Sequence, residues 1–88
     1  MTWTVKFDKK ADKQFGQLGR NAQLQIQSFI DNKLSKSIEP RKLGKQLVGN
    51  HKGLWRFRTG DYRLICEAHN KELILLVIHV GHRKDIYR

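Results

Sequence analysis

The chain has 88 residues, of which 18 are Lys or Arg and eight are Asp or Glu, so its formal net charge at pH 7 is +10. This length predicts a single domain spanning residues 1–88. The longest apolar run, Leu73–Ile78, is far shorter than the roughly 20 residues of a membrane span. The first residues alternate apolar and polar side chains, so we expect neither a secretory signal nor a membrane association.

The single cysteine, Cys66, excludes an internal disulfide. Small secreted domains usually need disulfides, so we expect a protein of the reducing cytoplasm. The sequence has no Cys-x-x-Cys and no His-x-x-x-His pair. It therefore predicts neither a metal site nor a bound cofactor.

The charge points to an anionic partner. A strongly positive small protein attracts polyanions and gains free energy by releasing the counterions of a phosphate backbone. Nucleic acid is the first candidate. An anionic membrane surface, an acidic protein, or basicity that serves solubility alone are the alternatives.

The first half of the chain predicts one strand and two helices. Trp3–Phe7 alternates with a period of two, which is typical of a strand. Asp8 is placed to cap a helix whose apolar positions have helical spacing, and Asn21 is placed to cap a second helix. The second helix should be followed by a break at Ser35–Glu39 and Pro40. The apolar positions of the two helices are Ala11, Phe15, Leu18, Ala22, Ile26, Phe29, Ile30 and Leu34.

The second half predicts three strands joined by short turns. The basic, glycine-containing segment Arg41–Gly53 is expected to hold a single helical turn. The predicted strands are Leu54–Arg58, Tyr62–Ala68 and Leu73–Val80, and the last of these should be buried on both faces. The predicted fold is α+β with the order βααβββ, in which two helices cover one face of an antiparallel-rich sheet and a basic face stays open.

Strand alternation sorts the side chains between the two faces. With Trp55 and Phe57 toward the helices, Arg56 and Arg58 point to the open face. The same alternation sends Tyr62, Leu64 and Cys66 inward, and Arg63, Ile65 and Glu67 outward. Gly81 should turn the chain so that His82 and Arg83 approach the same surface. The alternative is a solvated sheet face on which the arginines pair with Glu67 and Asp61.

Tyr87 lies after the last strand among basic residues. A tyrosine there can stack on a base or hydrogen-bond a ribose, or it can pack the tail. Trp3 and Trp55 are expected in the core, and Cys66 is expected to be a buried small hydrophobe.

Two motifs resemble a known family. The order of elements, the run Trp55–Leu64 and the tail Val80–Arg88 are similar to the RelE/ParE superfamily of bacterial toxins, over essentially the whole chain. RelE-type members are endoribonucleases that cut mRNA at the ribosomal A site. ParE-type members inhibit DNA gyrase and are not known as nucleases.

The RelE resemblance implies functional roles for particular residues. The positions that match its catalytic set are Arg56, Arg58, Arg63, Arg83 and Tyr87. The first two positions are lysines in well-known members, and arginine does not lose its proton near neutral pH. His82 is therefore our candidate proton carrier. The predicted catalytic residues are Arg58, Arg63, His82, Arg83 and Tyr87, and the predicted RNA-binding residues are Arg56, Lys52, Lys84 and Arg88.

The resemblance also implies partners. The expected partners are a cognate acidic antitoxin, mRNA and the ribosome, with a toxin–antitoxin complex of higher order that binds DNA through the antitoxin. The first functional hypothesis is a metal-independent mRNA endoribonuclease that inhibits translation. The alternatives are a gyrase inhibitor of the ParE type and a basic nucleic-acid-binding module without chemistry.

Overall fold

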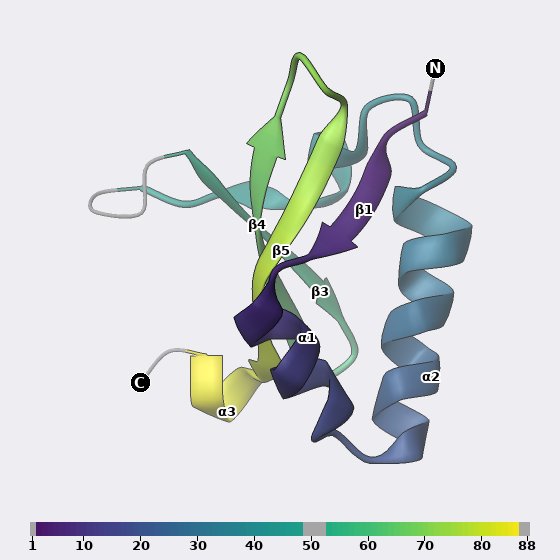
Figure 1. Cartoon of the computed structure of the whole chain (residues 1–88), viewed down its shortest axis with the longest axis vertical. Coiled ribbons are helices and arrows are strands. Elements are labelled where there is room, and N and C mark those ends of the chain that lie inside the picture. Colours follow the sequence, from purple (N-terminus) through teal and green to yellow (C-terminus); the bar gives the residue numbers. More distant parts are fainter. Residues whose placement is uncertain (1, 49–52, 87–88) are drawn as a thin grey trace.

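The structure, a computed structural model, describes residues 2–48 and 53–86 (Figure 1). Within those ranges a five-stranded mixed sheet has the order β1-β5-β4-β3-β2. Strand β1 runs parallel to β5, and the other neighbours are antiparallel. The elements in chain order are β1 (Thr4–Phe7), α1 (Lys9–Gly16), α2 (Arg20–Phe29), the π-helix η1 (Ile30–Leu34), the 3₁₀ turn η2 (Pro40–Leu43), β2 (Lys45–Gln46), β3 (Leu54–Thr59), β4 (Tyr62–His69), β5 (Ile74–His82) and α3 (Arg83–Ile86).

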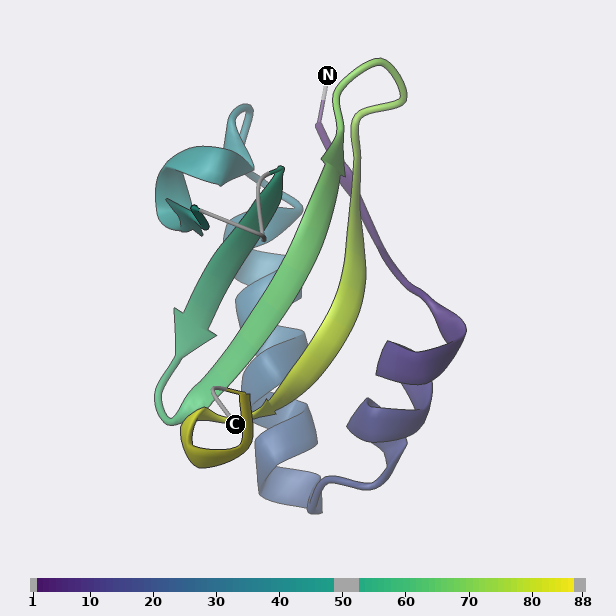
Figure 2. The ribbon, with the colours of Figure 1, turned by 90° about the vertical axis from the view of Figure 1, so that its left-hand side faces the viewer.

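The predicted α+β fold with two helices and an antiparallel-rich sheet is confirmed. Figure 2 shows α2 behind the sheet, while the short helix α3 lies in front of it at the opposite face. We call the face opposite α2 the outer face. The sequence analysis missed the two-residue edge strand β2 and the helix α3, both of which are too short to leave a periodic signal.

Helix α1 completes the edge of the sheet that β1 begins. Asp8 caps the helix as predicted, because its side chain accepts a hydrogen bond from the Ala11 backbone N–H at 2.8 Å. Beyond the end of β1, α1 packs beside β5, where Gln14 Oε1 accepts the Val80 backbone N–H at 2.9 Å. The helix thus satisfies a strand N–H that β1 does not reach.

Helix α2 and η1 carry the apolar stripe predicted for the second helix. Ile26, Ile30 and Leu34 are buried against the sheet. The predicted cap at Asn21 is wrong: Gly19 is the N-cap, and Asn21 lies inside the helix. Glycine supplies the extended backbone of a cap without a side-chain acceptor. Among the described residues, no helix is long and apolar enough to cross a membrane.

The core lies between α2 and the inner face of the sheet. Phe57 and Leu64 are paired across β3 and β4 and are fully buried, as are Leu75 and Val77 of β5. Trp3 is buried, and Trp55 packs at the margin of the core on the same face as Phe57. Cys66 is buried as expected, and burial raises the pKa of its thiol.

The prediction that the last strand is buried on both faces is wrong. The inward residues of β5 are buried, but Ile74, Leu76 and Ile78 are only partly covered. The reason is the single helical layer: α2 covers one face of the sheet, and among the described elements none of comparable size covers the other (Figure 2).

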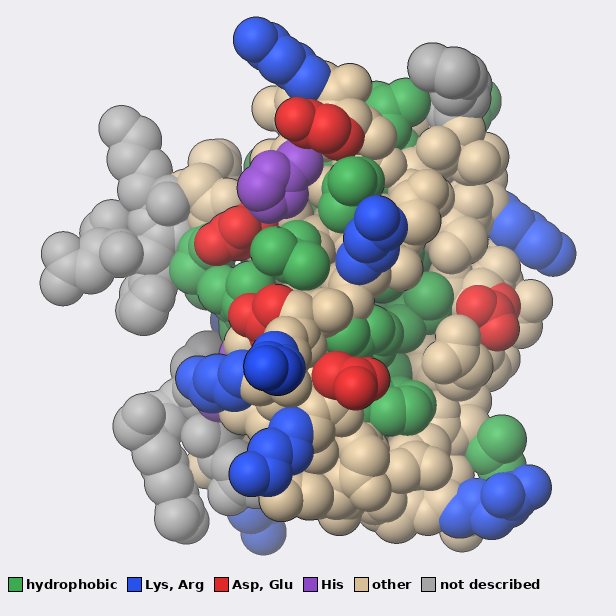
Figure 3. Space-filling view, viewed as in Figure 1, with side chains coloured by type: hydrophobic (Ala, Val, Ile, Leu, Met, Phe, Trp, Pro, Cys, Tyr) green, Lys and Arg blue, Asp and Glu red, His purple; other side chains and the backbone are tan. Residues whose placement is uncertain are grey.

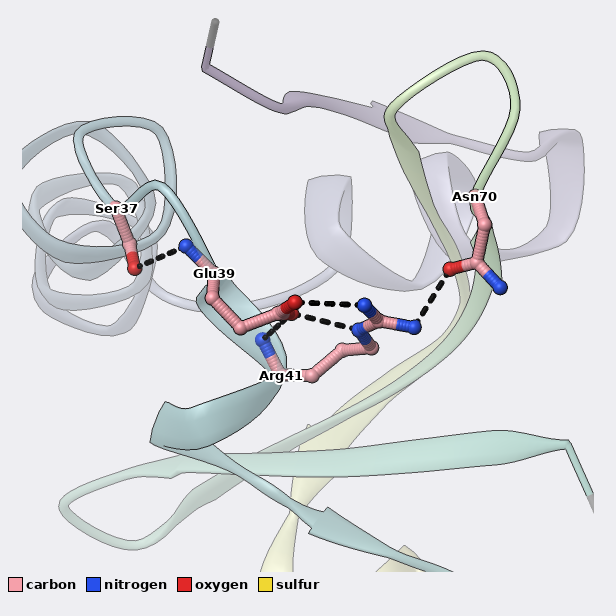
Figure 4. Close-up of polar contacts among 4 residues, drawn as sticks. All are labelled: Ser37, Glu39, Arg41 and Asn70. Carbon is pink, nitrogen blue, oxygen red and sulfur yellow. Dashed lines mark hydrogen bonds and ion pairs between the residues drawn. The ribbon is translucent and has the colours of Figure 1, made fainter.

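A charged clamp holds the segment before β2 in place (Figure 4). Arg41 binds both carboxylate oxygens of Glu39 at 2.6 Å, and its Nη1 donates to Asn70 Oδ1 at 2.7 Å. The guanidinium also lies 5.2 Å from the ring centroid of Trp3. The hydrogen bond from Arg41 lowers the pKa of the Glu39 carboxyl. These contacts tie η2 to the β4–β5 turn and to the N-terminal segment.

Gly44 lets this segment pack directly on β3. A Cβ at this position would lie 2.6 Å from the Arg56 carbonyl oxygen and 2.7 Å from two ring atoms of Phe57. The backbone of Gly44 is extended, so space and not conformation requires the glycine. The missing side chain therefore sets how closely η2 and β2 approach β3.

We predict that Gly44→Ala lowers the free energy of unfolding by about 1–3 kcal/mol, because the added methyl group forces β2 away from β3. Urea denaturation measures the effect. Gly16→Ala is the matched control: it lies in helix α1 with nothing within 4 Å of the added Cβ. That change should stabilise the protein by about 0.4–1 kcal/mol. Equal stability of Gly44→Ala and the wild type would contradict the packing described here.

Candidate functional site

Two arginines face each other on the outer face, next to the turn between β3 and β4. Strand pairing sets Arg58 of β3 directly opposite Arg63 of β4, and Arg63 directly opposite Gly81 of β5. Residues opposite each other in antiparallel strands project from the same face. Gly81 has no side chain but is itself buried, and the short helix α3 lies over this end of the outer face (Figure 2). We call Arg58, Arg63 and Gly81 the arginine row.

The turn between β3 and β4 sets this pairing. Thr59 pairs with Tyr62, which leaves Gly60 and Asp61 as a two-residue loop. Gly60 has a φ of 60°, a value that L side chains adopt rarely. The sequence analysis predicted this turn and this alternation of side chains, and the register confirms that Arg56, Arg58 and Arg63 share one face.

Arg63 is buried more deeply than we expected for a side chain on an open face. Only 8% of the residue is exposed. Its Nη1 donates to the backbone carbonyl oxygens of Gly60 at 3.0 Å and Tyr62 at 3.1 Å. These two hydrogen bonds fix the guanidinium of Arg63 beside the β3–β4 turn.

Arg83 lies at the same end of the sheet. Its backbone N–H donates to the Asp61 carbonyl oxygen at 2.7 Å, and its Nε lies 3.8 Å from Asp61 Oδ1. Both side chains are exposed, so this ion pair contributes little to stability. The contact anchors the start of α3 at the β3–β4 turn, beside the arginine row. Lys84, predicted to bind RNA, follows on α3 and is exposed.

The structure contradicts the position that we expected for His82. Strand β5 continues through His82, which pairs with Tyr62 and not with Arg63. The two rings pack edge to face with centroids 5.8 Å apart, and His82 Nδ1 accepts the Lys84 backbone N–H at 3.2 Å. Strand alternation thus sends His82 to the face opposite the arginine row, because the chain turns one residue later than expected.

His79 of β5 pairs with an outer-face residue of β4. Strand pairing sets it opposite Ile65, two positions from the arginine row. Gln14 of α1 approaches its Nδ1 at 3.5 Å. Partial burial, and secondarily the positive charge of Lys10, lower the pKa of His79. The sequence analysis gave this residue no role. Its face depends on a register shift between Ile65 and Cys66, which only the structure shows.

A basic pocket adjoins the arginine row. It has a volume of about 230 Å³ and lies between β3 and the η2–β2 segment. The lining residues are Lys42, Leu43, Gly44, Lys45, Arg56 and Arg58. The sequence analysis assigned Arg56 and Arg58 to the site but missed both lysines, since it predicted a single helical turn in their segment and no strand beside β3. We call this hollow the lysine–arginine pocket.

Three predicted site residues, Lys52, Tyr87 and Arg88, lie outside the described residues. Glu67 lies on the outer face away from the arginine row, near the far end of β4, and contacts His69 at 3.1 Å. Among residues 2–48 and 53–86, no group of three or more His, Cys, Asp or Glu side chains is gathered to hold a metal ion.

The whole-chain comparison defines the class of protein. The family model for the ParE toxin of the type II toxin–antitoxin system parDE matches residues 2–87. The chain therefore belongs to the RelE/ParE superfamily of type II toxins, and the predicted resemblance is confirmed.

Individual relatives lie on the RelE side of the superfamily. Toxin RelG of Mycobacterium tuberculosis is 31% identical over 88 residues, which cover 100% of this chain and 99% of the relative. The toxin–antitoxin complex RelBE2 from the same organism contains a chain with a TM-score of 0.86 and 26% identity, covering 94% of this chain and 100% of that one. The RelE–RelB complex of Pyrococcus horikoshii OT3 gives a TM-score of 0.70 at 26% identity, covering 97% of this chain and 99% of that one.

We predict that Arg63→Ala destabilises the protein by about 1–3 kcal/mol, because it removes the donors that satisfy two backbone carbonyls. Arg58→Ala is the matched control, since Arg58 is exposed on the neighbouring strand. It should change stability by no more than about 0.5 kcal/mol. Thermal or urea unfolding of both variants measures the difference, and equal stabilities would contradict the anchoring role of Arg63.

We also predict that His79 titrates below its usual pKa of 6.5 and is therefore neutral at pH 7. Its ring signals in an NMR titration measure the pKa. Lys10→Gln should raise the pKa only part of the way, because burial is the larger cause and remains in the variant. Full return of the His79 pKa to its usual value would mean that the charge of Lys10, and not burial, lowers this pKa.

Proposed function

We propose that this toxin is a metal-independent endoribonuclease that cuts mRNA on the ribosome and so inhibits translation. The observation that carries the proposal is the arginine row, with Arg83 beside it, on the sheet face that α2 leaves uncovered. Three guanidinium groups at one end of a sheet suit a ligand with several phosphoryl oxygens.

The chemistry needs charge stabilisation more than any other contribution. The ribose 2′-OH gives up its proton to a weak base and attacks the adjacent phosphorus. The P–O2′ bond forms as the P–O5′ bond breaks, which leaves a 2′,3′-cyclic phosphate and a 5′-oxygen that takes up a proton. The phosphoryl oxygens gain negative charge in the transition state, and fixed arginines stabilise it. Arg63 is held by two backbone carbonyls, so its guanidinium needs little reorganisation to do so.

Each remaining role follows from position. Arg58 projects beside Arg63 and clamps the phosphate from the β3 side, while Arg83 holds the leaving-group side. Tyr87, placed by the family resemblance, orients the 2′-OH. The arginines retain their protons near neutral pH and do not act as the base. On the ribosome a weak base suffices once the strand is held in line for attack.

The family model favours a second candidate function. Its description is that of a ParE toxin, and members of that type bind DNA gyrase. A gyrase inhibitor needs a protein-binding surface, but it does not need several arginines gathered at one site. The names of the similar chains, RelG and RelE, together with the arginine row, support the nuclease over the gyrase inhibitor.

An acidic antitoxin is the proposed protein partner. Chains that are similar in fold include toxins from toxin–antitoxin complexes, such as RelBE2 and the archaeal RelE–RelB pair. The charge of +10 attracts an acidic chain. Charge pairs at a surface contribute little, so an apolar anchor is also needed. Leu24 of α2 and Ile38 after η1 are large apolar side chains that are exposed.

The direct experiment compares two activities of the same preparation. The purified protein is added to translating ribosomes and the mRNA ends are mapped, and in parallel it is added to a gyrase supercoiling reaction. We expect new mRNA ends and unchanged supercoiling. Inhibition of supercoiling without mRNA cleavage would contradict the proposed nuclease and would support a gyrase inhibitor of the ParE type.

We predict that Arg83→Ala reduces the rate of mRNA cleavage by about 10²–10³, the usual effect of removing one group that stabilises transition-state charge. The fold should be retained, because Arg83 is exposed and its ion pair is weak. Arg20→Ala is the matched control: it removes the same exposed side chain from the start of α2, away from the outer face. Circular dichroism checks the fold. If the Arg83→Ala variant cleaves mRNA at the rate of the control variant, the assignment of Arg83 to the catalytic site is wrong.

A further inference from the structure

The lysine–arginine pocket is formed by specific contacts between the η2–β2 segment and β3. Gly44 packs its backbone on β3 where no other residue would fit, and this contact brings the η2–β2 segment beside β3. Lys45 of β2 pairs directly with Arg56 of β3, so the two side chains leave the same face. The clamp between Arg41 and Glu39 fixes the turn that carries Lys42.

The pocket is suited to an anion. Four of its six lining residues are cationic, and none of the six is acidic. Like charges gathered around one hollow repel each other and raise its affinity for negative groups. The volume of about 230 Å³ exceeds the roughly 30 Å³ share of one water molecule several-fold, so a hydrated phosphate group fits.

Arg58 connects the pocket to the arginine row. Its side chain lines the pocket, and it pairs with Arg63 in the arginine row. Along β3, Arg56 and Arg58 are two residues apart, which separates them by about 7 Å. That separation is comparable to the distance between neighbouring phosphates of an extended single strand. A strand with one phosphate at the arginine row can therefore place an adjacent phosphate in the pocket.

We propose that the lysine–arginine pocket is a second phosphate subsite, in which Lys42 and Lys45 bind the backbone phosphate next to the one at the arginine row. This inference rests on the RNA cleavage proposed above. Single-stranded RNA is favoured over an acidic protein segment for two reasons. The pocket continues the arginine row, and Leu43 is the one apolar side chain in its lining, which gives a protein chain little to pack against.

The test is the salt dependence of RNA binding by the full chain. The probe is a short single-stranded RNA with 2′-O-methyl groups, which block the attacking hydroxyl. Fluorescence anisotropy gives the affinity of the wild type, of Lys42→Gln/Lys45→Gln and of a control, Lys36→Gln/Lys71→Gln. The control removes the same charge from exposed positions outside the pocket.

In the pocket variant the negative slope of log affinity against log salt should become less steep by about 0.7, the value for one lost phosphate contact on a single strand. The control should keep the slope of the wild type. Equal slopes for both variants would overturn the subsite. Loss of affinity for an acidic antitoxin peptide with unchanged RNA binding would also overturn it and assign the pocket to protein.

Cleavage of unmodified mRNA by the wild type is measured separately. If the wild type cuts mRNA and the two slopes are equal, the subsite fails and the proposed function stands. If the wild type cuts no mRNA on ribosomes, the proposed function fails, whatever the slopes show. A single variant, Lys45→Gln, repeats the slope measurement should the double variant fold poorly by circular dichroism.

Discussion

The pairing of β3 with β4 is the constraint on which the rest of the structure depends. The two-residue turn at Gly60 and Asp61 fixes the register, and a slip of one residue would exchange every inward and outward side chain. With this register Phe57 and Leu64 close the core under α2, and Arg58 and Arg63 meet on the other face. The hydrophobic core and the cationic site are therefore two sides of the same pairing.

Two arginines directly across from each other lower the stability of the sheet, because like charges in cross-strand pairs repel. The structure reduces this cost at Arg63 by giving its guanidinium two backbone carbonyls. Asp61 brings a negative charge near Arg83 at the same turn. The remaining positive charge is available to a ligand. This arrangement is expected where the arginines serve binding and not the stability of the fold.

The η2–β2 segment has a larger role than its two short elements suggest. The contacts of Arg41 with Glu39, Asn70 and Trp3 hold it from one side, and the close approach of Gly44 to β3 holds it from the other. A rigid segment positions Lys42 and Lys45 at little entropic cost on binding. In this way an edge strand of two residues extends the cationic surface beyond the arginine row.

The sequence by itself determined the order of the main elements, the inward and outward residues of β3 and β4, and the family. These properties depend on local periodicity, on a recognisable turn and on two contiguous motifs. Tertiary structure alone decided the burial of Arg63, the face of His82 and the pocket that includes Lys42 and Lys45. Each of these depends on where a strand ends, on a register shift, or on contact between segments distant in the chain. Local patterns do not encode such relations, because they arise from the packing of one element on another.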